Sequence, residues 1–287
     1  MSDFDIIVGG GNTANIVKMF FPKARVIACG FGNKLPLCEM WITDATTKFV
    51  SEFGLEYDRN CMVANYLTNG DLSAAIKQYN KITHKPKNNK PSMGKKLIDI
   101  YQTILPECKI DVLDEVEHIK TVGKHLIGDR INTYKRLFWC APIDRVKIDD
   151  KRFDQRMHPI TVVKMWHDKE VFHSNYIYLF EKKYLDKGLY RVTKKTNDTA
   201  GWDYFVEIAA DKENLDLTSI LECLEQDGFE GSVFRGLWGV PNGHISGKDR
   251  PKDTKNIFFI GRFAQNNNEL LMSDVVEKCY EIRGKLE

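Results

Sequence analysis

The chain has almost no net charge and no long apolar run. Its 42 lysines and arginines nearly balance 40 aspartates and glutamates, which leaves a formal net charge of +2. This balance creates no strong field for a polyanion, so we expect no nucleic-acid partner. No apolar stretch is long enough to cross a bilayer, and the first residues show no basic segment followed by an apolar one. We therefore expect no membrane association.

The chain also lacks the usual patterns of metal sites and of nucleophilic catalysis. Its seven cysteines form no C-x-x-C pair, and its seven histidines show no ligand spacing, so no metal is expected. Scattered thiols in odd number favour a reducing compartment and predict a cytoplasmic protein. No serine lies in a G-x-S-x-G setting, and no G-K-[ST] phosphate loop follows the glycines. The pattern therefore assigns no catalytic residue.

The most informative segment that is present lies in the first fourteen residues. The apolar run FDIIV (4–8) precedes GGGNTA (9–14), which fits the G-x-G-x-x-G/A fingerprint of dinucleotide-binding folds. In this interpretation Gly9 permits a tight turn, Gly11 lets the backbone approach a pyrophosphate, and Ala14 lets helix and strand pack closely. Asn12 and Thr13 would begin the helix under the phosphate. A helix to residue 21 and a strand over 25–28 complete a β-α-β beginning.

Periodicity predicts the remaining elements. Apolar residues on one stripe predict an amphipathic helix over 95–105. One or two short helices are expected within 61–80, and Asp71 is a fair N-cap for a helix over 72–79. Buried strands are expected over 137–141, ending at Pro142, and over 256–260, with a last helix over 274–286. Between them the chain is mostly strands, with one helix at about 217–226 and a loop over 236–243.

These elements predict an α/β fold in which a Rossmann-like cofactor domain is built from both ends of the chain. The cofactor domain is expected to comprise residues 1–60, 91–148 and 246–287. An antiparallel-sheet substrate lobe is expected over 149–245, and a helical or loop insertion over 61–90.

Four segments of the sequence, taken in chain order, resemble segments of the flavin amine oxidase and UDP-galactopyranose mutase superfamily. They are the fingerprint at 9–14, PSMG (91–94) with the helix and the strand ending in DEVEHI (114–119), LFWCAPID (137–144), and NIFFIGRF (256–263) before the last helix. The resemblance implies a two-lobed FAD-binding fold. It also implies that Val116 lies beside the adenine and Pro142 beside the cofactor. The implied contacts near the flavin are Gly261, Arg262, Phe263 and Asp274.

The sequence departs from this superfamily in several places. The paired glycines that usually follow the second strand are replaced by Gly30-Phe31-Gly32. The acidic residue that usually ends the second strand and binds the ribose is missing, because the strand runs into Ala28-Cys29-Gly30-Phe31 and the next acids are Glu39 and Asp44. The tyrosine and second arginine of the mutases, expected after Gly261-Arg262, are replaced by three asparagines (266–268).

The resemblance implies an FAD-dependent oxidoreductase acting on an unidentified small substrate. Candidates to line its substrate pocket come from the second lobe: Tyr204, Arg235, Trp238 and His244. One alternative is a nucleotide-sugar mutase that uses reduced flavin, in which Arg191 and Arg235 would hold a diphosphate. Another is a non-catalytic relative that binds a nucleotide or nothing. The sequence does not give the oligomeric state.

Overall fold

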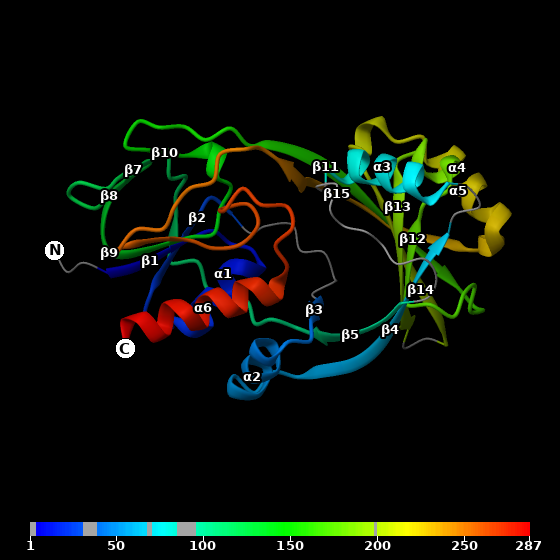
Figure 1. The fold of residues 1–287 in the computed structure, drawn as a ribbon, viewed down its shortest axis with the longest axis horizontal. Helices are drawn as coiled ribbons and strands as arrows, with labels where there is room; N and C mark the ends of the chain where they lie inside the picture. Colours follow the sequence, from blue (N-terminus) through cyan, green and yellow to red (C-terminus); the bar gives the residue numbers. More distant parts are fainter. Residues whose placement is uncertain (1–3, 31–38, 68–70, 85–95, 198–199) are drawn as a thin grey trace. The chain divides into compact units, whose positions relative to one another are not determined.

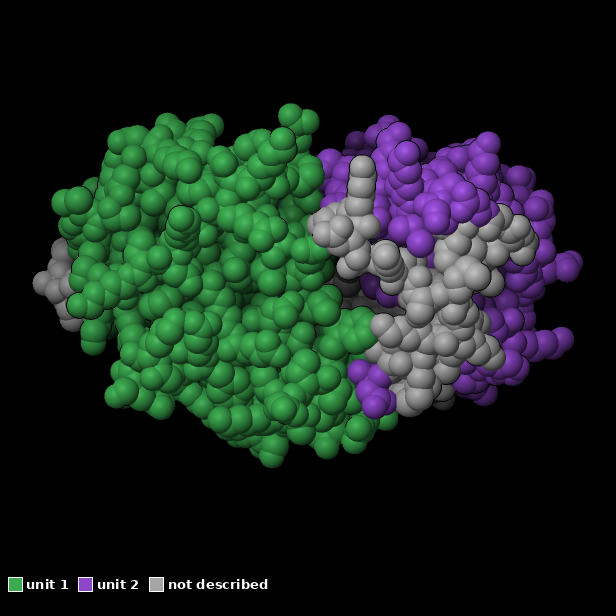
Figure 2. All heavy atoms as spheres, in the orientation of Figure 1, with its two compact units in different colours: residues 1–60, 100–156, 245–287 green, residues 61–99, 157–244 purple. Residues whose placement is uncertain are grey.

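The computed structural model describes residues 4–30, 39–67, 71–84, 96–197 and 200–287. These form two compact units, each assembled from separate stretches of the chain (Figures 1 and 2). Unit 1 comprises residues 1–60, 100–156 and 245–287, and unit 2 comprises residues 61–99 and 157–244. The proposed pyrophosphate and flavin contacts named above all fall in unit 1.

Unit 1 contains a sheet in which five strands run parallel in the order β6-β2-β1-β9-β16. The first half of β9 also pairs with a small meander, in the order β10-β7-β8-β9. The strands are β1 (Phe4–Val8), β2 (Arg25–Ala28), β6 (Val112–Leu113), β7 (His118–Lys120), β8 (His125–Ile127), β9 (Ile131–Trp139), β10 (Lys147–Ile148) and β16 (Ile257–Phe259). The helices are α1 (Asn12–Phe20), α2 (Asp44–Glu52) and α6 (Met272–Leu286).

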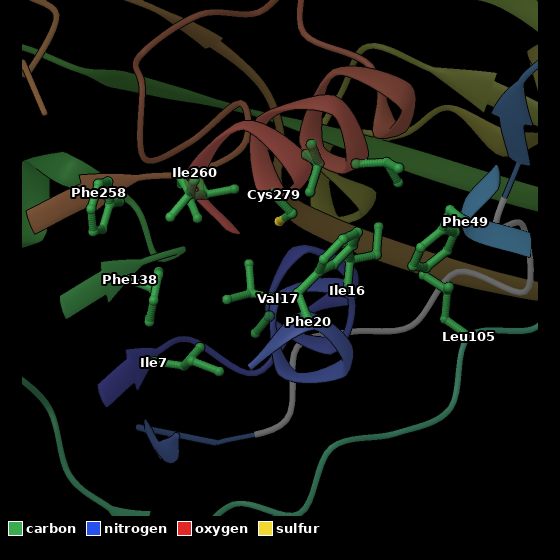
Figure 3. Close-up of a cluster of buried hydrophobic side chains, with 14 of the residues drawn as sticks. Ile7, Ile16, Val17, Phe20, Phe49, Leu105, Phe138, Phe258, Ile260 and Cys279 are labelled. Carbon is green, nitrogen blue, oxygen red and sulfur yellow. The ribbon is translucent and has the colours of Figure 1, made fainter. Parts of the chain in front are cut away.

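One face of this sheet is covered by α1 and α6, and the resulting core includes residues from both ends of the chain. Figure 3 shows Ile7 of β1, Phe138 of β9 and Phe258 of β16 on the sheet side, with Val17 of α1 and Cys279 of α6 on the helix side. All five are buried in one apolar cluster. Burial of this surface, at about 25 cal/mol per Å², fixes α1 against the sheet and so fixes the turn that precedes it.

Unit 2 is built around a mainly antiparallel sheet in the order β15-β11-β14-β13-β12-β4. Strand β14 pairs antiparallel with β11 and β13, β13 pairs antiparallel with β12, and β12 pairs in parallel with β4. Its strands are β12 (Tyr176–Leu179), β13 (Leu189–Asn197) and β14 (Gly201–Ile208), together with most of β4 (Tyr57–Leu67), β11 (Arg156–His167) and β15 (Val233–Ser246). Its helices are α3 (Leu72–Thr83), α4 (Lys182–Leu185) and α5 (Leu217–Leu224), the last followed by a π-helical turn (Glu225–Phe229). The predicted antiparallel lobe is confirmed.

Three predictions of local structure were wrong. The predicted helix over 95–105 is a strand, β5 (Lys96–Thr103), which pairs antiparallel with β3 (Glu39–Trp41), so tertiary pairing outweighs the helical spacing of its apolar residues. The segment 61–67 belongs to β4 rather than to a helix. The expected loop over 236–243 lies inside β15, whose position at the end of the sheet order tolerates Pro241.

The start of α3 was predicted correctly. Asp71 accepts a hydrogen bond from the Ser73 N–H at 2.8 Å, so it is the N-cap of α3. In the described part of the chain, no helix is both long enough and apolar enough to span a bilayer.

Candidate functional site

The five parallel strands of unit 1 end in register at one edge of the sheet. Val8 pairs with Ile27 and with Trp139, Trp139 pairs with Phe259, and Ala28 pairs with Leu113. The segments that leave this edge are therefore neighbours, and they begin at Gly9, Cys29, Asp114, Cys140 and Ile260. Ligands of open parallel sheets bind outside the carboxyl ends of the strands, so this edge is the candidate site.

The glycine turn after β1 packs directly on the chain that leaves β2. The Gly9 N–H donates to the Ile27 carbonyl at 2.9 Å. A Cβ atom added at Gly10 would lie 2.6 Å from the carbonyl oxygen of Gly30, closer than real Cβ contacts. Gly10 is therefore required by the close approach of two backbones. Gly11, in contrast, is exposed and has open space where a side chain would be.

The N-terminus of α1 has no capping side chain. Gly11 is the N-cap residue, no side chain accepts a hydrogen bond there, and the first turn contains no acidic residue. The first backbone bond of the helix runs from the Asn15 N–H to the Gly11 carbonyl at 3.1 Å, so the N–H groups of Asn12, Thr13 and Ala14 precede the helical ladder. These N–H groups and the positive end of the helix dipole form a place for an anion.

The C-terminal Gly-Arg corner meets the N-terminal turn in space. Gly261 follows β16 with a φ of +87°, and a Cβ added to it would lie 2.8 Å from the Thr13 hydroxyl oxygen. Only glycine fits there without displacing Thr13. The half-buried Arg262 side chain turns towards its own segment, where Nη2 donates to the Leu270 carbonyl at 3.3 Å. The two predicted corners thus contact each other.

Buried amides hold the segment after Gly261 in place. Gln155 donates from Nε2 to the Phe263 carbonyl at 2.8 Å and accepts from the Ile143 N–H at 3.3 Å. Asn266, which has a φ of +50°, donates to the carbonyls of Asp154 (3.0 Å) and Asp249 (2.7 Å). Gln155 could not be identified from the sequence, because no motif or spacing marks it. Asn266 differs from the tyrosine or arginine expected in the mutases, and this departure is the only sign of it in the sequence.

The other predicted cofactor contacts take several positions. Pro142 precedes a 3-10 turn (Ile143–Arg145) after β9, while Val116 is buried in the core beneath the meander. Asp274 lies in the first turn of α6, where Oδ2 accepts from the Leu271 N–H at 2.6 Å. Burial raises the pKa of the Cys140 thiol well above its ordinary value, so this residue beside Gly9 stays protonated at neutral pH.

The end of β2 offers no carboxylate. Cys29 is exposed after the last residue of the strand, and Gly30 packs against Gly10 as described. The sequence contains no acid between Arg25 and Glu39. Phe31, Gly32 and the segment PSMG (91–94) lie outside the described residues.

Two of the predicted substrate contacts are buried inside unit 2. Tyr204 is 0% exposed, and its hydroxyl accepts from the Val171 N–H at 2.8 Å. His244 is 6% exposed, and its Nε2 lies 3.2 Å from the Tyr190 hydroxyl, which donates to Glu207 at 2.7 Å. Neither side chain can contact a substrate without leaving the core, because close packing and these bonds hold both in place.

The other two predicted contacts are accessible. Arg235 is exposed on β15, with its guanidinium carbon 5.4 Å from the centre of the Trp166 ring. Trp238 lies on the same strand and is half-buried, 6.5 Å from the Phe205 ring centre. Arg191 donates from Nε to Glu207 Oε1 at 2.8 Å. Its guanidinium is therefore already engaged by a carboxylate.

Comparison with solved structures identifies the fold. A triple mutant of putrescine oxidase superposes with a TM-score of 0.61 over 99% of this chain and 98% of that one, at 10% identity. Reduced UDP-galactopyranose mutase gives 0.59 over 99% and 94%, at 10% identity. An oxidoreductase from Methanosarcina mazei gives 0.61 over 97% and 99%, at 10% identity. The fold predicted from the sequence is confirmed. No family model and no curated protein matches the chain.

Proposed function

We propose that the chain binds FAD at the carboxyl edge of the unit 1 sheet and is an FAD-dependent oxidoreductase acting on a small substrate. The observation that carries the proposal is the contact between Thr13, in the first turn of α1 after the glycine turn, and the Gly261 corner. These two segments lie 250 residues apart in the sequence, from Gly11 to Gly261, and leave the same edge of the sheet. At Gly10 and at Gly261 there is no room for a side chain. The likeness in fold to putrescine oxidase and to an archaeal oxidoreductase supports the same activity class.

The residues present suit a dinucleotide. The uncapped N–H groups of Asn12, Thr13 and Ala14 would bind the pyrophosphate, and open space at Gly11 would admit it. Backbone at Gly261 and Arg262 would lie along the flavin end of the cofactor. The backbone of Val116, whose side chain is buried, remains our proposed contact for the adenine side, and Pro142 for the central part.

The flavin would supply the redox chemistry, which is hydride or electron transfer. The chain would supply binding, orientation and electrostatics. The Arg262 guanidinium would add positive charge near the site, and the buried amides of Gln155 and Asn266 would hold the corner that carries it. The Cys140 thiol would act as a neutral wall, because a protonated thiol is not a nucleophile.

The mutase reaction is supported less well than oxidation. It needs cationic side chains that are available to hold a diphosphate, whereas Arg191 is paired with the buried Glu207 carboxylate. Of the two arginines proposed to hold the diphosphate, Arg235 is the exposed one. We therefore keep the mutase as an outcome of the test and not as a second proposal.

The test is a visible absorption spectrum of the purified full chain, before and after addition of FAD and gel filtration. We expect absorbance near about 450 nm that remains with the protein, as for flavoproteins in general. Protein that stays colourless after FAD is added would overturn the proposal and favour the non-catalytic alternative. Turnover of a UDP-sugar only after reduction of the flavin would favour the mutase.

A further inference from the structure

An open cavity is lined entirely by residues of unit 2. Its volume is about 1020 Å³, and it is lined by α3, by the turn between α4 and β13, by the residues after β14 and by the first turn of α5. Ligand sites for small molecules typically occupy about 300–1,000 Å³, so the cavity has room for an organic molecule and not only for a simple ion. The proposed FAD site in unit 1 does not use any of these residues.

Three lysines line this cavity. Lys77 and Lys81 lie four residues apart on α3, so their side chains share one face of the helix. Within the described part of the chain, neither ammonium group has an ion-pair or hydrogen-bond partner. Lys187 comes from the turn before β13, and its ammonium donates to the Ser219 hydroxyl of α5. Two charges are thus available for a ligand, and the third is held in position.

The carboxylates of the cavity are already engaged. Asp186 accepts a hydrogen bond from Gln78 Nε2 at 3.3 Å, and Asp216 caps α5 by accepting from the Ser219 N–H at 3.1 Å. The three ammonium groups outnumber these two carboxylates. Burial, together with the neighbouring His158, lowers the pKa of His84, so this residue of the lining adds no charge at neutral pH.

The remaining lining is largely apolar. Ile220 of α5 is buried, and Ile82 and Leu215 are half-buried around the cavity. An occupant that matches both parts has an anionic group for the lysines and an apolar body for this surface.

We propose that this cavity binds a small phosphate monoester with an apolar body, with the phosphate on Lys77 and Lys81 and beside Lys187. A phosphate monoester is close to dianionic at neutral pH and has three acceptor oxygens, so it can contact several ammonium groups at once. A carboxylate has one charge and two oxygens and uses this arrangement less fully. The proposal is independent of the proposed FAD site, because the two sites lie in different units.

The test is isothermal titration of the full chain with phenyl phosphate in the presence of excess FAD. We expect saturable binding that is weakened about tenfold in a Lys77→Ala/Lys81→Ala variant, because two exposed ion pairs, each of modest strength, are removed together. The matched control is a Lys169→Ala/Lys182→Ala variant, which removes two exposed lysines of unit 2 outside the cavity. It should bind phenyl phosphate like the parent protein.

Further probes separate the parts of the proposal. Inorganic phosphate and benzoate should both bind more weakly than phenyl phosphate, since one lacks the apolar body and the other the second charge. The thermal unfolding midpoint of both double variants should match that of the parent protein, because all four lysines are exposed. The proposal is overturned by absence of saturable binding at millimolar phenyl phosphate, or by equal weakening in the two double variants.

Discussion

Replacement of Gly11 by aspartate should separate cofactor binding from folding. Gly11 is the N-cap of α1, it is exposed, and a side chain added there meets no atom within 4 Å. Aspartate is a better N-cap than glycine by a few tenths of a kcal/mol, so the free energy of unfolding of the FAD-free protein should stay equal or rise slightly. Its carboxylate would accept hydrogen bonds from the N–H groups of Thr13 and Ala14, which we assign to the pyrophosphate.

The loss of FAD affinity in Gly11→Asp should be large. A carboxylate about 4 Å from a phosphate, at an effective dielectric constant of about 20, is repelled by about 4 kcal/mol. This corresponds to a rise in Kd on the order of a thousandfold at low salt, and to less at high salt. The assay is a flavin-fluorescence titration, paired with thermal unfolding of the FAD-free protein.

Two variants serve as controls for this experiment. Gly11→Asn has the same shape without the charge and should lose much less affinity, so the difference from aspartate measures the electrostatic part. Gly284→Asp adds the same charge to an open position on α6 and should leave FAD binding unchanged. The reasoning is refuted if Gly11→Asp binds FAD as tightly as the parent protein while remaining folded.

Three other perturbations have defined outcomes. Gly261→Ala, at a φ of +87°, should lower the free energy of unfolding by about 2 kcal/mol in chemical denaturation, and an unchanged midpoint would contradict the contact described here. The hydrogen bonds from Arg283 hold the pKa of Glu52 in the folded protein below its usual 4.5. The stabilisation of the folded state by this pair is therefore complete above pH 4.5, and it is lost as the pH falls through the lowered pKa. Arg283→Met should therefore cost less than about 1 kcal/mol at pH 7, because the pair is partly exposed, and it should flatten the acid part of the stability profile; an unchanged profile would exclude the linkage. Alkylation followed by peptide mass spectrometry should label the exposed Cys29 faster than the half-buried Cys140, whose raised pKa keeps the thiol protonated, and FAD should protect Cys29. Equal labelling of Cys29 with and without FAD would place the cofactor elsewhere.

The glycine turn could be predicted because its signal is local. A buried strand, three glycines and a helix follow one another within twenty residues, and each constraint acts on its immediate neighbours. Strand β5 was missed because the same apolar residues satisfy a helical stripe. In the structure this segment pairs with β3 as a strand. Ile104, which belongs to the predicted apolar stripe of the helix, is 87% exposed.

The polar supports of the site could not be predicted in the same way. Gln155 and Asn266 are 111 residues apart, and their amides meet at 3.1 Å only after the sheet and its connections have formed. Such contacts have no periodicity and no fixed spacing. Burial of Tyr204 and His244 was missed for a similar reason, since aromatic and imidazole side chains occur both in cores and in pockets.

The middle position of β9 and the packing of α6 on α1 have a consequence for synthesis. The N-terminal turn is translated long before β16, which pairs with β9, and before α6, which covers part of the same core. Until α6 has left the ribosome, the apolar residues of β9 and α1 that it covers remain exposed. The nascent chain must therefore keep this surface from aggregating until β16 and α6 have been translated.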